Sequence, residues 1–178
     1  MTLYSNSTND ESAFDANGYI QSLDSDGFSV NRGSNPGDAV NGTGTYVAWC
    51  WKAGGAAVAN IDGSINSQVS VNQTAGFSIV SYTGTGSAGT VGHGLGKRPK
   101  VVIVKSRDAS TNWPVFFDGI SDNQNEVLQL NLTNAEATAG DFFNGGDTTT
   151  TTFPLGSGGG QTNTSGPVSY THLRAHET

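Results

Sequence analysis

The sequence predicts an all-β fold, built from antiparallel sandwich-like modules repeated in tandem, the second of them truncated. Three observations predict this class. Gly accounts for 25 of the 178 residues, charged residues make up only 13 %, and short alternating runs recur between turn-forming residues. This profile excludes a helical bundle, which needs Ala, Leu, Glu and Lys.

The predicted strands are short and separated by Gly, Asn and Asp. Residues 45–51 are the strongest candidate, because they are rich in aromatic and β-branched side chains. Residues 101–104 are continuously apolar, as expected for a strand covered on both faces. The remaining candidates are residues 18–23, 27–30, 68–72, 76–82, 113–117 and 127–132, with 148–155 a weaker one.

An internal repeat relates two parts of the chain at an offset of 125 residues. It matches Leu3, Asn6, Thr8, Asn9 and Glu11 with Leu128, Asn131, Thr133, Asn134 and Glu136, Phe28 with Phe153, and Gly33 with Gly158. After a three-residue gap, Gly37, Asn41 and Gly44 match Gly159, Asn163 and Gly166. The shared Thr-Asn-x-Glu predicts a capping box on a short helical turn in each copy.

The repeat also predicts the domain organisation. We expect residues 1–52 to be the C-terminal part of a preceding β module, residues 53–75 to be a linker with room for one strand, and residues 76–166 to be a second module. The first copy continues into residues 45–51, whereas the second changes character after Gly166. The second module is therefore expected to lack its last strand and to leave an open sheet edge.

Residues 168–178 differ in character from everything before them. They match, without a mismatch, the translation of a transposase adapter used to prepare sequencing libraries, and Pro167 stands at the junction. We therefore expect residues 167–178 to be a disordered, adapter-derived tail. His172 and His176 have a spacing that suits zinc ligands on a helix, but this origin gives them no functional weight.

The charge balance disfavours a nucleic-acid partner, because the net charge is −7 and phosphate binding needs a basic stripe. The one basic cluster is expected to be a solvated strand end and comprises Lys97, Arg98, Lys100, Lys105 and Arg107. No apolar stretch approaches the ~18 residues of a membrane span, so no membrane insertion is predicted. The single cysteine, Cys50, lies between two tryptophans and is expected to be buried.

A series of segments carries a family resemblance. It comprises residues 46–55, 76–84, 91–96 and 99–105, and its most specific string is His-Gly-Leu-Gly-Lys-Arg-Pro-Lys at residues 93–100. The series resembles repeated β-rich modules in structural and tail-fibre-like proteins of tailed bacteriophages, especially marine ones, many of which are domains of unknown function. The resemblance spans residues 3–166.

The resemblance implies a virion component of the tail or of the host-contact apparatus. Its implied partners are other virion proteins or further copies of the chain in a homo-oligomer, together with a host-surface glycan or protein. It supplies no catalytic residues and implies no cofactor.

His93 lies in a Gly-rich turn that leads into residues 101–104. It could act as a base or a metal ligand, but no cysteine or second native histidine accompanies it, so we predict a turn residue that hydrogen-bonds the backbone. The turn superficially resembles a phosphate-binding loop. Because Pro99 and a strand follow where a helix is required, nucleotide binding is excluded.

The carboxylates form no predicted catalytic site. Asp24 and Asp26 mimic the start of a calcium loop, but Asn35 stands where a bidentate acid is needed, so we favour a β-turn. The alternative of a non-helical calcium site with Asp15 or Asp38 stays open. The acids considered for glycoside cleavage, for which no spacing fixes a pair, are Asp118, Asp122, Glu126 and Asp141.

The tryptophans supply the candidate ligand-binding residues. Trp49 and Trp51 lie on one side of a predicted strand and are expected in the core. Trp113 is expected at the surface, where its flat ring could stack on a sugar with Asn112 beside it.

Three functions are compatible with the sequence. The preferred one is a non-catalytic phage tail or fibre protein that presents loops for host-surface contact. The alternative is a lectin-like carbohydrate-binding module of a secreted bacterial protein, and a depolymerase domain is the least favoured.

Overall fold

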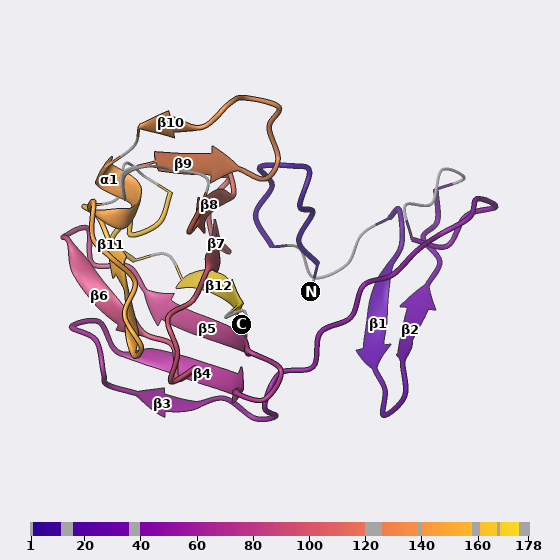
Figure 1. The fold of residues 1–178 in the computed structure, drawn as a ribbon. Helices are drawn as coiled ribbons and strands as arrows, with labels where there is room; N and C mark the ends of the chain where they lie inside the picture. Colours follow the sequence, from indigo (N-terminus) through magenta and orange to yellow (C-terminus); the bar gives the residue numbers. More distant parts are fainter. Residues whose placement is uncertain are drawn as a thin grey trace.

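The computed structural model describes residues 2–11, 16–35, 40–119, 126–138, 140–157, 161–166 and, by backbone alone, 168–174. Figure 1 shows that the regular structure of this part of the chain is strands, apart from the helical turn α1 (Gly140–Phe143). The strands pair antiparallel within three sheets, so the all-β prediction is confirmed. In the described part of the chain, no helix has the length and apolar character needed to cross a bilayer.

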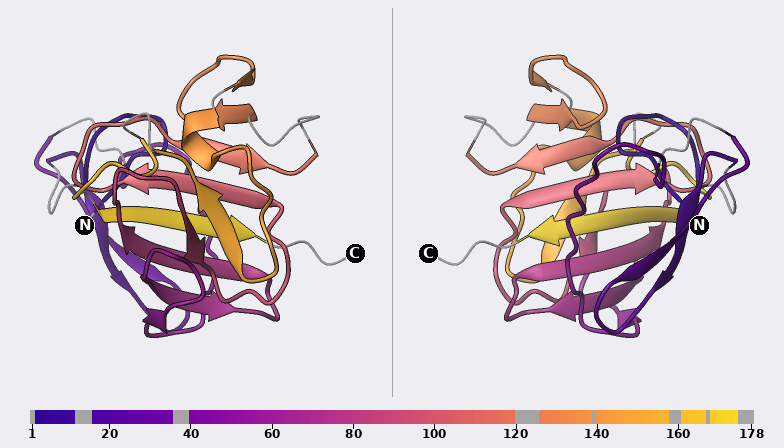
Figure 2. Two further views of the ribbon diagram at one scale, coloured as in Figure 1. Left: turned by 90° about the vertical axis from the view of Figure 1, so that its left-hand side faces the viewer. Right: turned by 90° about the vertical axis from the view of Figure 1, so that its right-hand side faces the viewer.

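The largest sheet has the strand order β10-β9-β8-β7-β12-β5-β4-β3. Its strands are β3 (Val58–Asn60), β4 (Ser67–Asn72), β5 (Phe77–Thr83), β7 (Val101–Ser106), β8 (Pro114–Phe117), β9 (Glu126–Gln129), β10 (Ala137–Thr138) and β12 (Val168–Arg174). Figure 2 shows β12, in yellow, within this sheet. Thr171 in β12 pairs with Val80 in β5 and with Val104 in β7.

A second layer covers one face of this sheet and closes the core. It consists of β6 (Gly89–Gly92), β11 (Thr152–Leu155) and the turn α1 (Gly140–Phe143). Phe153 of β11 is fully buried and meets Tyr82 of β5 edge to face, with ring centroids 6.3 Å apart. Alternation along β5 and β7 aims Val80 and Val104 at the same core, where both are fully buried.

The remaining hairpin, β1 (Tyr19–Leu23) and β2 (Phe28–Asn31), stands apart from this body. The Asp24 N–H donates to the Gly27 carbonyl at 2.9 Å and closes the turn. The predicted turn before Phe28 is therefore confirmed. The hairpin is largely exposed, and Leu23 leaves 83 % of its surface in solvent, because no second layer covers it.

Residues 45–51 differ most from expectation. They form no strand, since no described segment pairs with them. Trp49 and Trp51 are 75 % and 60 % exposed, and Cys50 is exposed as well. The predictions of a buried cysteine and of buried tryptophans are wrong, because β propensity produces a strand only where a neighbour completes its hydrogen bonds.

Two further expectations are corrected. Residues 168–174 are not disordered, because their backbone pairs with β5 on one side and with β7 on the other. Backbone pairing of this kind places few demands on sequence, which explains why side-chain character did not predict it. Residues 53–75 hold both β3 and β4, so this segment contributes two strands to the main sheet.

Candidate functional site

The N-terminal segment, residues 4–11, lies against the region where β7 ends and β8 begins. The buried Trp113 is central to this contact, because its indole Nε1 donates to the Ser7 carbonyl at 2.9 Å. Its backbone meanwhile holds the turn after β9: the Trp113 N–H donates to Asn131 Oδ1 at 3.0 Å, and the Leu130 N–H donates to the Trp113 carbonyl at 3.0 Å. One residue therefore joins the N-terminal segment to the turn that follows β9.

This placement corrects the expectation for the predicted ligand-binding pair. Trp113 is only 7 % exposed, so it is not the surface ring that sugar stacking requires. Asn112 accepts a hydrogen bond from Asn131 Nδ2 at 2.9 Å. Both side chains are engaged within the protein.

Lys105 lies in the same region and is 1 % exposed, contrary to the predicted solvated strand end. Its Nζ donates to the carbonyls of Ser106, Ala109 and Thr8, at 2.8, 3.0 and 3.3 Å. Burial lowers the pKa of Lys105, and the negative charge of Asp10 opposes that shift. Three carbonyls match the three donors of an ammonium group, which is the compensation that a buried lysine needs.

Arg107 completes the contact with the N-terminal segment. Its carbonyl accepts a hydrogen bond from the Glu11 N–H at 2.8 Å, and its Nε pairs with the Glu11 carboxylate. The predicted capping box at Thr8 is wrong, because the Glu11 carboxylate binds this cation. We call residues 4–11 the docking segment, and Lys105, Arg107 and Trp113 the docking surface.

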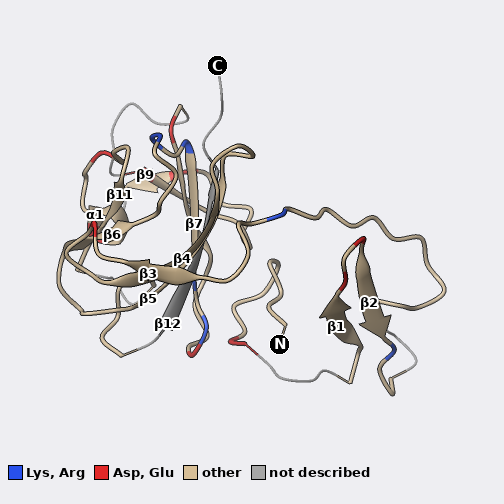
Figure 3. Cartoon of the chain, turned by 90° about the horizontal axis from the view of Figure 1, so that it is seen from below, with Lys and Arg blue, Asp and Glu red and all other residues tan. Residues whose placement is uncertain are grey.

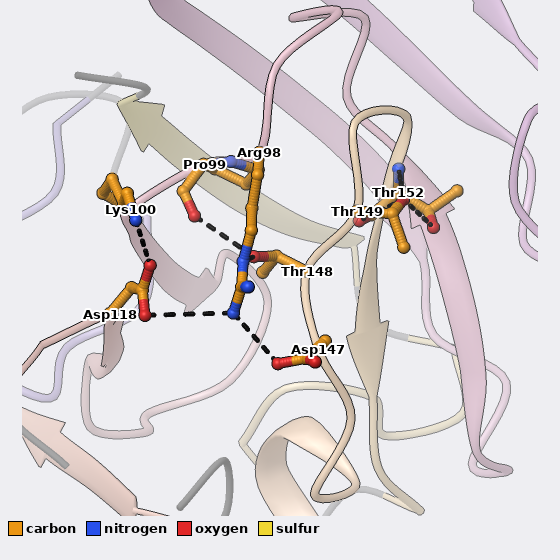
Figure 4. A network of polar contacts seen from close by, with 8 residues as sticks. All are labelled: Arg98, Pro99, Lys100, Asp118, Asp147, Thr148, Thr149 and Thr152. Atoms are coloured by element: carbon orange, nitrogen blue, oxygen red, sulfur yellow. Dashed lines mark hydrogen bonds and ion pairs between the residues drawn. The ribbon is translucent and has the colours of Figure 1, made fainter. Parts of the chain in front are cut away.

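A second polar cluster lies at the opposite end of β7 (Figure 4). Arg98 Nη2 lies 2.9 Å from Asp147 Oδ1 and 3.8 Å from Asp118 Oδ1, and Lys100 Nζ lies 2.5 Å from Asp118 Oδ2. The hydrogen bond from Lys100 lowers the pKa of Asp118, burial opposes this shift, and Arg98 reinforces it. An ionised, paired carboxylate is poorly suited to donate a proton, so the cluster links loops instead of forming an acid–base pair.

The cations of the predicted basic cluster lie at the two ends of β7 and form no single group. Lys97, Arg98 and Lys100 precede β7 and Arg107 follows it, and Figure 3 shows charged residues mainly in loops and at strand ends. No continuous basic stripe runs through the described residues.

His93 is fully buried beside β11. Its Nδ1 accepts a hydrogen bond from the Leu95 N–H at 3.1 Å, and its Nε2 lies 3.3 Å from the Thr149 carbonyl. Nε2 therefore carries the proton of a neutral ring, in agreement with burial, which lowers the pKa of His93. The prediction of a turn residue that bonds the backbone is confirmed.

The calcium candidates belong to the β1–β2 turn. Asp24 accepts hydrogen bonds from the hydroxyls of Ser22 and Ser29, at 2.9 and 2.8 Å. The described residues contain no group of three or more His, Cys, Asp or Glu side chains placed to hold a metal. Asp15 and Asp38 lie outside the described residues, as does Asp122. Of the other acids, Glu126 lies in β9 and Asp141 in α1.

These features define an all-β protein whose described polar clusters hold loops and distant segments together. The chain belongs to the DUF7483 family, a domain of unknown function, whose family profile matches residues 1–176. No curated protein matches the chain. No solved structure matches it.

Proposed function

We propose that this chain is a non-catalytic structural protein of a tailed-phage virion, a tail or fibre component made of tandem β modules. The observation that carries the proposal is a pair of matched turns. The Ser7 N–H donates to the Tyr4 carbonyl at 3.1 Å, and the Leu132 N–H donates to the Gln129 carbonyl at 3.1 Å. Both members of the second pair lie 125 residues after those of the first (129 − 4 and 132 − 7), which is the offset of the sequence repeat.

A second pair of turns supports the same relation. The Asp24 N–H donates to the Gly27 carbonyl at 2.9 Å, and the Thr149 N–H donates to the Thr152 carbonyl at 2.8 Å. These positions again differ by 125 residues (149 − 24 and 152 − 27). Each turn immediately precedes or begins a strand, β2 in one case and β11 in the other.

The position of β12 adds a third line of support. Gly44 matches Gly166 in the repeat, so residues 46–52 correspond to residues 168–174. The first set has strong strand propensity but pairs with no strand of the described residues, whereas the second set lies between β5 and β7. We propose that a strand like residues 46–52 takes the β12 position in other modules of this kind, and that residues 168–174 take it here.

This organisation suits an elongated, load-bearing protein. Repeated units that contact only their neighbours build extended assemblies, and their loops can be presented to a host surface. Antibodies against the purified chain should therefore label the tails of phage particles enriched from the source sample by electron microscopy. Label found only in a soluble bacterial secreted fraction would contradict the virion proposal.

One observation favours the lectin-like alternative. Trp49 and Trp51 expose large aromatic surfaces, and Trp51 stacks on Phe77 with ring centroids 6.2 Å apart. Exposed rings of this kind can stack on sugars. Glycan-array binding that is lost in Trp49→Ala but retained in Tyr46→Ala would support the lectin, and no binding by any form would oppose it.

A further inference from the structure

We infer that residues 129–136 are a second docking segment, which binds the docking surface of another module of the same kind. This inference rests on the tandem organisation proposed above and specifies how neighbouring modules meet. The partner is defined chemically as a β module that presents the equivalents of Lys105, Arg107 and Trp113.

The two segments share the features that the observed contact uses. The docking surface takes the Ser7 and Thr8 carbonyls and the Glu11 N–H from the first segment, so most of the recognition is by main chain. The side-chain contribution is the Glu11 carboxylate on Arg107. Glu136 stands at the matching position, and both segments begin with the same hydrogen-bonded turn.

The two segments differ in exposure, as expected if the first is bound to a docking surface and the second is available for one. Glu11 is partly buried, with 16 % of its side chain exposed, because it lies on Arg107. Residues 132–138 are all exposed, Glu136 included. Leu130 and Leu132 leave 49 % and 42 % of their surfaces in solvent. A pair of leucines on an exposed turn is a feature that contact with a partner would cover.

The geometry of the first contact indicates which neighbouring module the second segment binds. The first segment binds a surface that lies about 100 residues further along the chain, between Lys105 and Trp113. Repetition of the same relation places residues 129–136 on the surface of the following module. The contact is therefore head to tail, a heterologous arrangement that extends a filament.

The test uses full-length variants and labelled synthetic peptides with the sequence of residues 128–138. In the wild-type chain, the tethered first segment occupies the docking surface at high effective concentration, so the peptide should bind weakly. Glu11→Arg opposes Arg107 and should release the first segment. This variant should then bind the Glu136 peptide about tenfold more tightly than a peptide carrying Glu136→Arg, as measured by fluorescence anisotropy.

A charge-swapped pair provides the matched control. Arg107→Glu also repels Glu11 but should reverse the preference, so that it binds the Glu136→Arg peptide and rejects the original one. Circular dichroism establishes that both variants are folded. Reversed preferences would support the inference, whereas equal preferences, or no binding of either peptide to either folded variant, would overturn it. Tail labelling by the antibody would be unaffected in that case, so the two proposals can fail separately.

Discussion

Two regions of this chain that the proposed repeat relates have different degrees of burial. Phe28 in β2 is partly buried, whereas Phe153, its match in β11, is fully buried. Both follow the same hydrogen-bonded turn. The difference arises because β11 pairs with β6 and packs on the main sheet, whereas β2, among the described strands, pairs with β1 alone. Local sequence determines the turn, and the neighbouring layer determines the burial.

Asn41 and Asn163 show the same contrast for a polar side chain. Asn41 is exposed, but Asn163 is fully buried and tied into loops of the main body. Its Nδ2 donates to the carbonyls of Ser87 and Gly156 at 2.6 and 3.0 Å, and its Oδ1 accepts from the Thr85 N–H at 2.8 Å. A buried amide needs such partners, whereas Asn41 lies in an exposed segment.

The largest expected loss of stability comes from truncating the buried phenylalanine of the Phe28–Phe153 pair. Phe153→Ala should destabilise the chain by about 3–5 kcal/mol, because it leaves a cavity between the two layers. Phe28→Ala, the matched variant at the repeat position, should cost less than about 1 kcal/mol, as expected for a partly exposed side chain. Urea denaturation followed by circular dichroism measures both values. Equal losses would show that the two regions are packed alike.

A smaller loss of stability is expected where residues 4–11 contact the docking surface. Lys105→Met removes the donor shared by three carbonyls and should destabilise the chain by about 1–3 kcal/mol. Amide hydrogen exchange should also accelerate at residues 4–11, because the Thr8 carbonyl loses the hydrogen bond from Lys105 Nζ. Lys52→Met, at an exposed lysine, is the control and should change stability by no more than about 0.5 kcal/mol. If exchange at residues 4–11 were unchanged in Lys105→Met, Lys105 would not contribute to binding the docking segment.

The smallest effect is a dependence on pH. Burial holds the pKa of His93 below its usual value of 6.5 in the folded chain, so the unfolded chain takes up a proton first as the pH falls. Stability should therefore fall below about pH 6.5, with a slope of at most about 1.4 kcal/mol per pH unit from this group. His93→Gln should reduce the slope between pH 7.5 and 5.5 in thermal unfolding. An identical slope would indicate that His93 titrates normally.

The sequence predicted most of the strands because alternation and turn residues act locally. Residues 77–83 and 101–106 read as strands from their own side chains. Five described elements escaped prediction for physical reasons, two of them the short β10 and α1, Ala137–Thr138 and Gly140–Phe143. Gly89–Gly92 has little side-chain pattern, Val58–Asn60 is very short, and Val168–Arg174 pairs through its backbone. Residues 45–51 have strand propensity but form no strand, because no described segment pairs with them.

The docking surface could not be predicted from sequence because its contacts are mainly to carbonyl oxygens. Ser7 and Thr8 contribute main-chain groups that any residue would offer. The sequence signal for this contact is the repetition of Glu11 as Glu136, although the spacing from Thr8 and Thr133 predicts a capping box instead. A glutamate pairs with whichever cation the fold brings near, and here that cation is Arg107, 96 residues away.

The central claim is that residues 46–52 and 168–174 correspond to the same strand of one repeated module. The most direct measurement replaces residues 168–174 with the sequence of residues 46–52 and follows thermal unfolding together with amide exchange in β5 and β7. We predict a gain of about 1–3 kcal/mol, or roughly 3–10 °C, with slower exchange at Val80 and Val104, as a sequence of higher strand propensity occupies the position of β12. A lower midpoint with faster exchange at these two residues would contradict the claim.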